Sequence, residues 1–209
     1  MSDTDVFIVS ALRSAIALGK ESGALYPLAP VDLASKVMAE TIRRAGIDPK
    51  RLDDVIWGVV TPIGDQGANL ARLATLNANF PVHVPAISIN RMCGSSQQAV
   101  HFASQAILAG DADLVLAGGT EMMSHQMLGA DYPDEFPKSI PHDLVHQGIS
   151  AEMMAEKWNL TREEQDDFAF RSHEKAASAM DAGYFGGQIL PLTIPESENG
   201  KRKSYLFHA

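Results

Sequence analysis

A nearly continuous apolar run at residues 55–60, Val-Ile-Trp-Gly-Val-Val, most strongly limits the folds that are open to this chain. A strand without polar alternation suits a sheet that is covered on both faces, as parallel sheets are. A second apolar run follows at residues 113–117, and apolar residues recur at helical spacing elsewhere in this part of the chain. We therefore expect an α/β fold, with a mainly parallel sheet and helices on both faces.

Local signals predict where several elements begin and end. Pro30 stands where a helix would start, and Gly46 follows its last apolar residue. A capping box at residues 161–164, Thr-Arg-Glu-Glu, opens a helix that we expect to run to about residue 182. The remaining expected elements are strands at residues 6–9, 82–89 and 188–194 and helices at residues 69–77 and 149–158. Residues 123–141 are rich in Pro, Asp and Gly and predict an irregular excursion.

Cys93 is the only cysteine of the chain. It lies between a strand-like run and a helix-periodic run that ends near Gly110, which predicts a strand-to-helix elbow with the thiol in the first turn of the helix. Free N–H groups and the positive end of the helix dipole favour a thiolate at such a position. Because the thiolate is the reactive form, Cys93 is a candidate acyl-accepting nucleophile. The alternative is a buried cysteine that acts as a small hydrophobic residue.

Five segments of the chain share features with one enzyme family. They are Val-Ser-Ala-Leu-Arg-Ser at 9–14, Gly-Ala-Asn-Leu-Ala-Arg at 67–72, Asn-Arg-Met-Cys-Gly-Ser-Ser-Gln-Gln at 90–98, Ala-Gly-Gly-Thr-Glu-Met-Met-Ser at 117–124 and His-Gln-Gly-Ile-Ser-Ala-Glu at 146–152. In this order they resemble the opening strand, the interface helix, the nucleophile elbow, the strand and turn that follow it, and the pantetheine-tunnel segment of the thiolase family. Thiolases make and break the carbon–carbon bond of 3-ketoacyl-CoA.

The resemblance implies the first half of the thiolase fold, joined to part of an α-helical loop domain. Residues 1–120 would form the amino-terminal core half, and residues 121–209 would form a partial loop domain that ends prematurely in the polar run 196–209. Three segments of the family's second half, Asn-Glu-Ala-Phe, Gly-His-Pro and Cys-x-Gly-Gly-Gly, do not occur in this sequence. In the family they supply an oxyanion-hole residue, the histidine that activates the nucleophile and a second cysteine.

The function implied by the resemblance is acyl transfer between CoA thioesters through an acyl-cysteine at Cys93, with His146 lining the pantetheine tunnel. CoA and acyl-CoA are substrates of such an enzyme, so we expect no cofactor and no metal. A homo-oligomer or a pairing with a carboxyl-terminal thiolase half is expected. The alternative is a catalytically incomplete fragment or split subunit that only binds acyl-CoA or a partner chain. A ketoacyl synthase is a further alternative, which the segments at 117–124 and 146–152 disfavour.

Composition limits the partners and the compartment. A formal net charge of -9 argues against nucleic acid, whose partners usually present a basic patch. No run of the sequence approaches the length of a membrane-spanning helix, so we expect no membrane partner. A single cysteine excludes an internal disulfide and is consistent with a reducing compartment. The acidic start resembles neither a signal nor a transit peptide, so a cytoplasmic location is expected.

Overall fold

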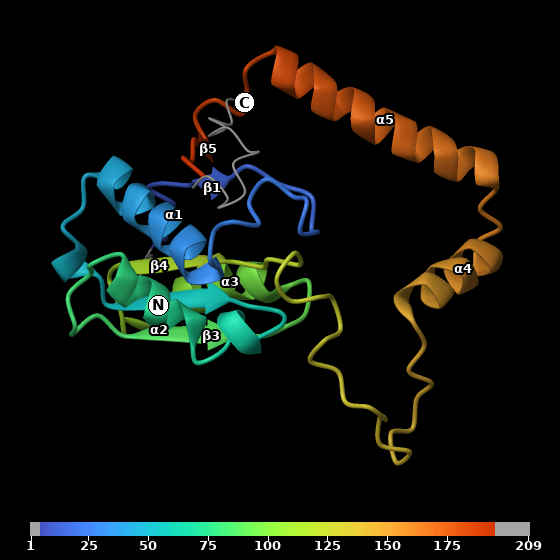
Figure 1. Cartoon of the computed structure of the whole chain (residues 1–209), viewed down its shortest axis with the longest axis horizontal. Coiled ribbons are helices and arrows are strands. Elements are labelled where there is room, and N and C mark those ends of the chain that lie inside the picture. The colour runs from blue at the N-terminus through green and yellow to red at the C-terminus, as the bar shows by residue number, and fades with distance from the viewer. Residues whose placement is uncertain (1–4, 195–209) are drawn as a thin grey trace. The chain divides into compact units, whose positions relative to one another are not determined.

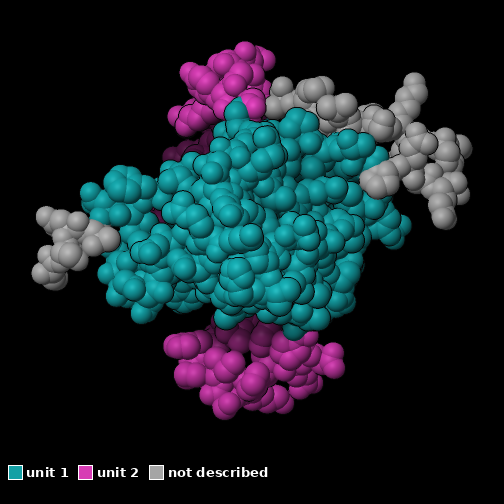
Figure 2. Space-filling model, turned by 90° about the vertical axis from the view of Figure 1, so that its left-hand side faces the viewer, with its two compact units in different colours: residues 1–131, 187–208 teal, residues 132–186, 209 magenta. Residues whose placement is uncertain are grey.

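The computed structural model describes residues 5–194 of the chain (Figure 1). These residues form two compact units, which are coloured separately in Figure 2. The first unit contains the described residues up to Asp131 and those from Gly187 onward, and the second is Tyr132–Gly186. The polar run 196–209, with its predicted premature ending, lies outside the described residues.

A parallel sheet forms the centre of the first unit. Its order is β3-β2-β4, and both neighbours of the central strand run parallel to it. The strands are β2 (Asp54–Gly58), β3 (Ala86–Ile89) and β4 (Val115–Gly119), and the helices of this unit are α1 (Pro30–Ala45), α2 (Leu70–Asn77) and α3 (Ser95–Ala109), with short 3₁₀ turns η1 (Pro49–Arg51) and η2 (Gly64–Gln66). The predicted α/β fold with a mainly parallel sheet is confirmed.

Helices cover the two faces of the sheet, as Figure 1 shows. Val55 and Trp57 of β2 pack with residues of α1 and α2, whereas Ile56 packs with Ala99 and Ala103 of α3. Successive side chains of a strand point to opposite faces, so α1 and α2 cover one face and α3 covers the other. Burial on both faces explains why β2 has no polar alternation.

The predicted bounds of α1 are confirmed. Pro30 occupies the first turn, where a backbone N–H has no acceptor within the helix, so proline loses no hydrogen bond there. Asp32 lies beside the positive end of the helix dipole. Gly46 ends the helix in the left-handed conformation, with φ 67°, and its N–H bonds to the carbonyl of Arg43. This position favours glycine because a side chain would meet its own backbone there.

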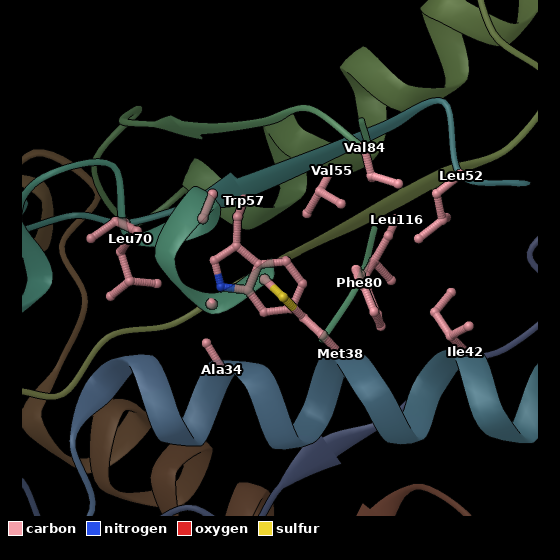
Figure 3. Close-up of a cluster of buried hydrophobic side chains, with 13 residues drawn as sticks. Ala34, Met38, Ile42, Leu52, Val55, Trp57, Leu70, Phe80, Val84 and Leu116 are labelled. Carbon is pink, nitrogen blue, oxygen red and sulfur yellow. The ribbon is translucent and has the colours of Figure 1, made fainter. Parts of the chain in front are cut away.

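The main core lies between α1 and the sheet (Figure 3). Met38 projects from the helix toward the ring of Trp57, and both side chains are buried. The indole N–H donates a 2.9 Å hydrogen bond to Thr120 Oγ1, which satisfies the one polar atom of the ring. Truncating a fully buried Met to Ala in such a core typically costs about 2–5 kcal/mol.

A smaller sheet closes the first unit. Strand β1 (Arg13–Ser14) pairs in parallel with β5 (Ile189–Leu190), which confirms part of the strand expected at 188–194. Around it lies a second apolar cluster, formed by Leu25, Leu28, Leu33, Met122, Leu192 and Ile194. This cluster packs residues near the end of the described chain against residues near its beginning. The boundaries of the compact units, after Asp131 and before Gly187, therefore differ from the predicted division at residue 120.

The strand predicted at residues 6–9 is wrong for the described part of the chain. These residues carry no strand assignment, and Phe7, Ile8 and Val9 are 76%, 79% and 65% exposed. Their β-branched and aromatic character favours a strand, but a strand also needs a neighbour to bond with its backbone. Within residues 5–194 no strand pairs with this run.

The second unit contains α4 (Gln147–Lys157) and α5 (Arg162–Asp181). The predicted capping box is confirmed, because Thr161 N donates to Glu164 Oε2 at 2.8 Å and Glu164 N donates to Thr161 Oγ1 at 3.2 Å. Asp167 and Arg171 form an ion pair one turn apart on α5. Among residues 5–194, neither these helices nor any other combine the length and apolar character needed to cross a bilayer.

Candidate active site

Cys93 lies between the carboxyl end of β3 and the start of α3, and it is exposed. The predicted strand-to-helix elbow is therefore present, and the alternative of a buried hydrophobic cysteine is wrong. The thiol is not in the first helical turn as predicted, because Gly94 is the N-cap and Ser95 is the first helical residue. Cys93 thus directly precedes the cap of α3, still next to the positive end of the helix dipole.

Hydrogen bonds from two side chains explain why the helix starts later than the sequence suggested. Asn90 Oδ1 accepts from Met92 N at 2.8 Å, which forms an Asx turn, and Met92 takes a left-handed φ of 48°. On the helical side, Ser95 Oγ accepts from Arg91 N at 2.9 Å and donates to Met92 O at 2.6 Å. The backbone just before Cys93 is therefore held in a turn that cannot continue the helix.

Glycines allow α3 to approach the sheet closely beside this elbow. A Cβ on Gly58, the last residue of β2, would lie 2.5 Å from Ser96 N and 2.7 Å from Ser95 C. A Cβ on Gly119, the last residue of β4, would lie 2.8 Å from Ser96 Cβ. Sequence reasoning missed both residues, although glycine at the end of an apolar strand signals a close backbone approach.

The loops that follow β2 and β4 are joined by a carboxylate. Glu121 Oε2 accepts from Val60 N at 2.7 Å and from Thr61 N at 3.3 Å. Its Oε1 accepts a 3.0 Å bond from Gln66 Nε2, and Gln66 is fully buried. These bonds satisfy the N–H groups of Val60 and Thr61, which have no partner in the sheet β3-β2-β4. They therefore fix the loops at the carboxyl end of the sheet, where Cys93 also lies.

Asn69, which precedes α2, fastens that helix to the outer edge of β3. Its Oδ1 accepts from Ser88 N at 3.0 Å, and its Nδ2 donates to Ala86 O at 3.0 Å. Arg72 donates to the carbonyl of Val82 at 2.9 Å. These contacts give Asn69 and Arg72 a structural role, because they hold the strand that leads to Cys93.

His146 lies in the second unit, where it is exposed and caps α4. Its Nδ1 accepts a 3.1 Å hydrogen bond from Gly148 N. Because Nδ1 accepts this hydrogen bond, Nε2 is the ring nitrogen that can donate one. Its predicted place in a pantetheine tunnel stays a prediction, since Cys93 belongs to the other unit.

Asp65, in the 3₁₀ turn η2 that precedes α2, has a shifted pKa. Desolvation alone would raise the pKa of Asp65, but hydrogen bonds from the Gln126 amide and the His125 ring outweigh it and lower the pKa. The His125 ring also contacts the Tyr26 carbonyl, so it joins the loops around residues 26, 65 and 125. Within residues 5–194 no three His, Cys, Asp or Glu side chains are grouped as a metal site would require.

Comparison with solved structures defines the class of fold. The structure matches the crystal structure of an acetyl-CoA acetyltransferase from Bacillus anthracis with a TM-score of 0.77 and 36% identity, covering 91% of this chain and 51% of that one. The fold is therefore that of the first part of a thiolase, as the sequence predicted.

The family follows from the sequence comparisons. The family described as "Thiolase, N-terminal domain" matches residues 6–205. A steroid 3-ketoacyl-CoA thiolase of Mycobacterium tuberculosis is 40% identical over 94% of this chain and 51% of its own length. A 3-ketoacyl-CoA thiolase of Serratia proteamaculans is also 40% identical, over 90% of this chain and 49% of its own. The chain belongs to the thiolase family, and it spans about half the length of the curated relatives it matches.

Proposed function

We propose that this chain supplies the nucleophile half of a thiolase-type acyltransferase, which acts on 3-ketoacyl-CoA by thiolysis or forms it by Claisen condensation. The observation that carries the proposal is the exposed thiol of Cys93 at the elbow of a thiolase fold. An exposed thiol beside a helix N-terminus has both the access and the local field that a nucleophile needs. The relatives named above act on substrates of this class according to their names.

In the first half-reaction, the thiolate of Cys93 attacks the carbonyl carbon of an acyl-CoA thioester. A new carbon–sulfur bond forms at Cys93, the bond to the CoA sulfur breaks, and CoA leaves as a thiolate that takes up a proton. In the second, an enolate of acetyl-CoA attacks the acyl-cysteine, which forms 3-ketoacyl-CoA and returns the thiolate. Thiolysis is the reverse of this sequence.

The resemblance assigns the remaining groups of the reaction to a carboxyl-terminal half. These are a second oxyanion donor, beside the Cys93 N–H, and the base that removes the methyl proton of acetyl-CoA. Losing one oxyanion donor typically lowers the rate by a factor of about 10²–10³. We therefore expect the chain alone to accept an acyl group slowly and to lack thiolysis activity. His146 is proposed to line the pantetheine tunnel, and the cytoplasmic location stays a prediction.

The experiment measures thiolysis of acetoacetyl-CoA by this chain alone, and then after adding a carboxyl-terminal half from a thiolase relative. Activity that appears only on addition supports the proposal. Cys93→Ser is the matched control, since it keeps the shape of the side chain and removes the thiol. Mass spectrometry after incubation with acetyl-CoA tests the nucleophile, and an acetyl adduct on any other residue refutes the assignment.

A second candidate function is binding without catalysis, as a subunit that holds acyl-CoA or a partner chain. It is favoured by apolar side chains of α3 that remain exposed, since Val100, Phe102 and Leu108 are 42%, 40% and 56% exposed. Large apolar side chains exposed on a helix are a surface that a partner can cover. Under this reading the chain binds a carboxyl-terminal half or a second copy in sedimentation, while the mixture shows no thiolysis.

A further inference from the structure

The backbone that leads into Cys93 is held by side chains rather than by regular secondary structure. Met92 has a φ of 48°, a conformation that is uncommon for a residue with a side chain. Such strain persists only where the surroundings impose it, and it gathers at functional sites. Asn90 and Ser95 are the two side chains whose hydrogen bonds impose the turn.

Asn90 connects the turn to the central strand. Its Nδ2 donates to Val60 O at 2.8 Å, just beyond the end of β2, while its Oδ1 accepts from Met92 N at 2.8 Å. The same amide group therefore bonds to the sheet at one end and to the elbow at the other. One bond uses the amide as a donor and the other uses it as an acceptor, a pairing that an Ala side chain cannot make.

Ser95 completes the turn from the helical side. It is only 3% exposed, and its hydroxyl accepts from Arg91 N and donates to Met92 O. Met92 O also accepts from Ser95 N at 3.0 Å, and Arg91 O accepts from Gly94 N at 3.1 Å. The N–H and C=O groups of both residues before Cys93 are thereby satisfied inside the elbow.

We propose that Asn90 and Ser95 are positioning residues for the thiol of Cys93, an inference that rests on the proposed acyl-acceptor role of that cysteine. They keep Cys93 directly in front of the α3 N-terminus by fixing the turn at Arg91 and Met92. Without them the turn relaxes from its left-handed conformation, and the thiol moves away from the N-terminal amide groups of α3, the end of a helix beside which negative charge is favoured.

The test measures the rate at which iodoacetamide alkylates the intact chain. Cys93 is the only cysteine, so every adduct reports this position. Asn90→Ala and Ser95→Ala should each react about tenfold more slowly, which is the upper range for losing a typical intramolecular hydrogen bond. Asn90→Ser should fall in between, because a serine hydroxyl closes the same kind of turn more weakly. This rescue separates positioning from a general loss of structure.

Ser96→Ala is the matched control, because this exposed serine follows Ser95 in the first turn of α3 and its hydroxyl forms no hydrogen bond within residues 5–194. It should react within about twofold of the unmodified chain, well inside the tenfold effect expected from a lost hydrogen bond. Unfolding midpoints recorded for every variant ensure that rates are compared between folded chains. Alanine variants at Asn90 and Ser95 that react as fast as the unmodified chain overturn the proposal, and so does an equal loss in Ser96→Ala.

Incubation of the same variants with acetyl-CoA distinguishes this inference from the proposed function. If the chain and its variants follow the expected order with iodoacetamide but form no acetyl-cysteine, the positioning role stands and the acyl-acceptor role fails. If acetylation follows the same order as alkylation, both are supported. Acetylation of Cys93 with equal alkylation rates in all variants supports the acyl-acceptor role and overturns the positioning role.

Discussion

The close approach of α3 to β2, the central strand, can be tested by adding one methyl group at Gly58. In Gly58→Ala the new Cβ would lie 2.5 Å from Ser96 N and 2.7 Å from Ser95 C, and both of these are backbone atoms of the first turn of α3. Ordinary van der Waals contact begins at 3.4 Å, so strand and helix must separate by about 0.9 Å. Backbone atoms cannot rotate away as a flexible side chain can, so the helix start itself has to move.

Forcing an extra methyl group into a packed site typically costs about 1–3 kcal/mol. For a chain of this size each kcal/mol lowers the melting temperature by about 2–4 °C, so the expected loss is about 2–12 °C. The displacement acts at the turn that carries Cys93, so alkylation of that thiol should change together with stability.

Thermal unfolding followed by the fluorescence of Trp57 measures this effect. The chain has two tryptophans, and a Trp158→Phe background leaves only the buried one in the first unit. Gly187→Ala is the control in the same unit, because its Cβ would meet no atom within 4 Å. Both variants restrict the unfolded chain equally, so their difference isolates the clash. Equal melting temperatures for Gly58→Ala and Gly187→Ala would refute the close approach.

Three further predictions follow from single groups. Thr61 Oγ1 is buried without a hydrogen-bond partner among the described residues, so Thr61→Val should raise stability by about 1 kcal/mol in urea unfolding. Hydrogen bonds from Arg43 and Arg44 lower the pKa of Glu40 to about 2 from the ordinary value of 4.5. The ionised form therefore stabilises the fold above about pH 4.5, and this stability is lost as the pH falls toward 2. Glu40→Gln should cost up to about 1 kcal/mol at pH 7, since such surface pairs are weak. The cost should shrink as the pH falls below 4.5 and through about 2, where half of the Glu40 carboxyl is protonated in the folded chain. A cost that stays constant in acid contradicts this cause. Thr161→Ala should cost α5 about 1 kcal/mol, visible as lower helicity in circular dichroism.

Many local features could be predicted because they depend on neighbours a few residues away. The start of α1 at Pro30, its end at Gly46 and the capping box at Thr161 each involve groups within one or two helical turns. The junction at Cys93 was predicted for the same reason, since a strand pattern and a helix pattern meet there. The pairing of β1 with β5 gives a weak signal in the sequence, because each of these strands has only two residues.

The details of the site required contacts across the chain. Asn90 bonds to a carbonyl 30 residues away, and Glu121 bonds to an amide 61 residues away. No sequence window contains both partners of these bonds, so neither the bond that ties Asn90 to the end of β2 nor the reason for glycine at position 58 could be predicted. The turn at Met92 is different, because Asn90 lies only two residues before it, and this local signal was missed. The exposed run at residues 6–9 shows the opposite error, since a strand pattern alone does not supply a partner strand.

The order of apolar runs, the helix caps and the position of the single cysteine were thus determined by the sequence, because propensity and capping act over a few residues. What ties the elbow to the sheet, and how closely α3 approaches β2, was decided by tertiary structure. The physical reason is that each backbone polar group must find a partner. At the elbow the backbone groups of Arg91 and Met92 find their partners within residues 90–95. The carbonyl of Val60, at the end of β2, finds its partner in the Asn90 side chain, which only the folded sheet brings to it.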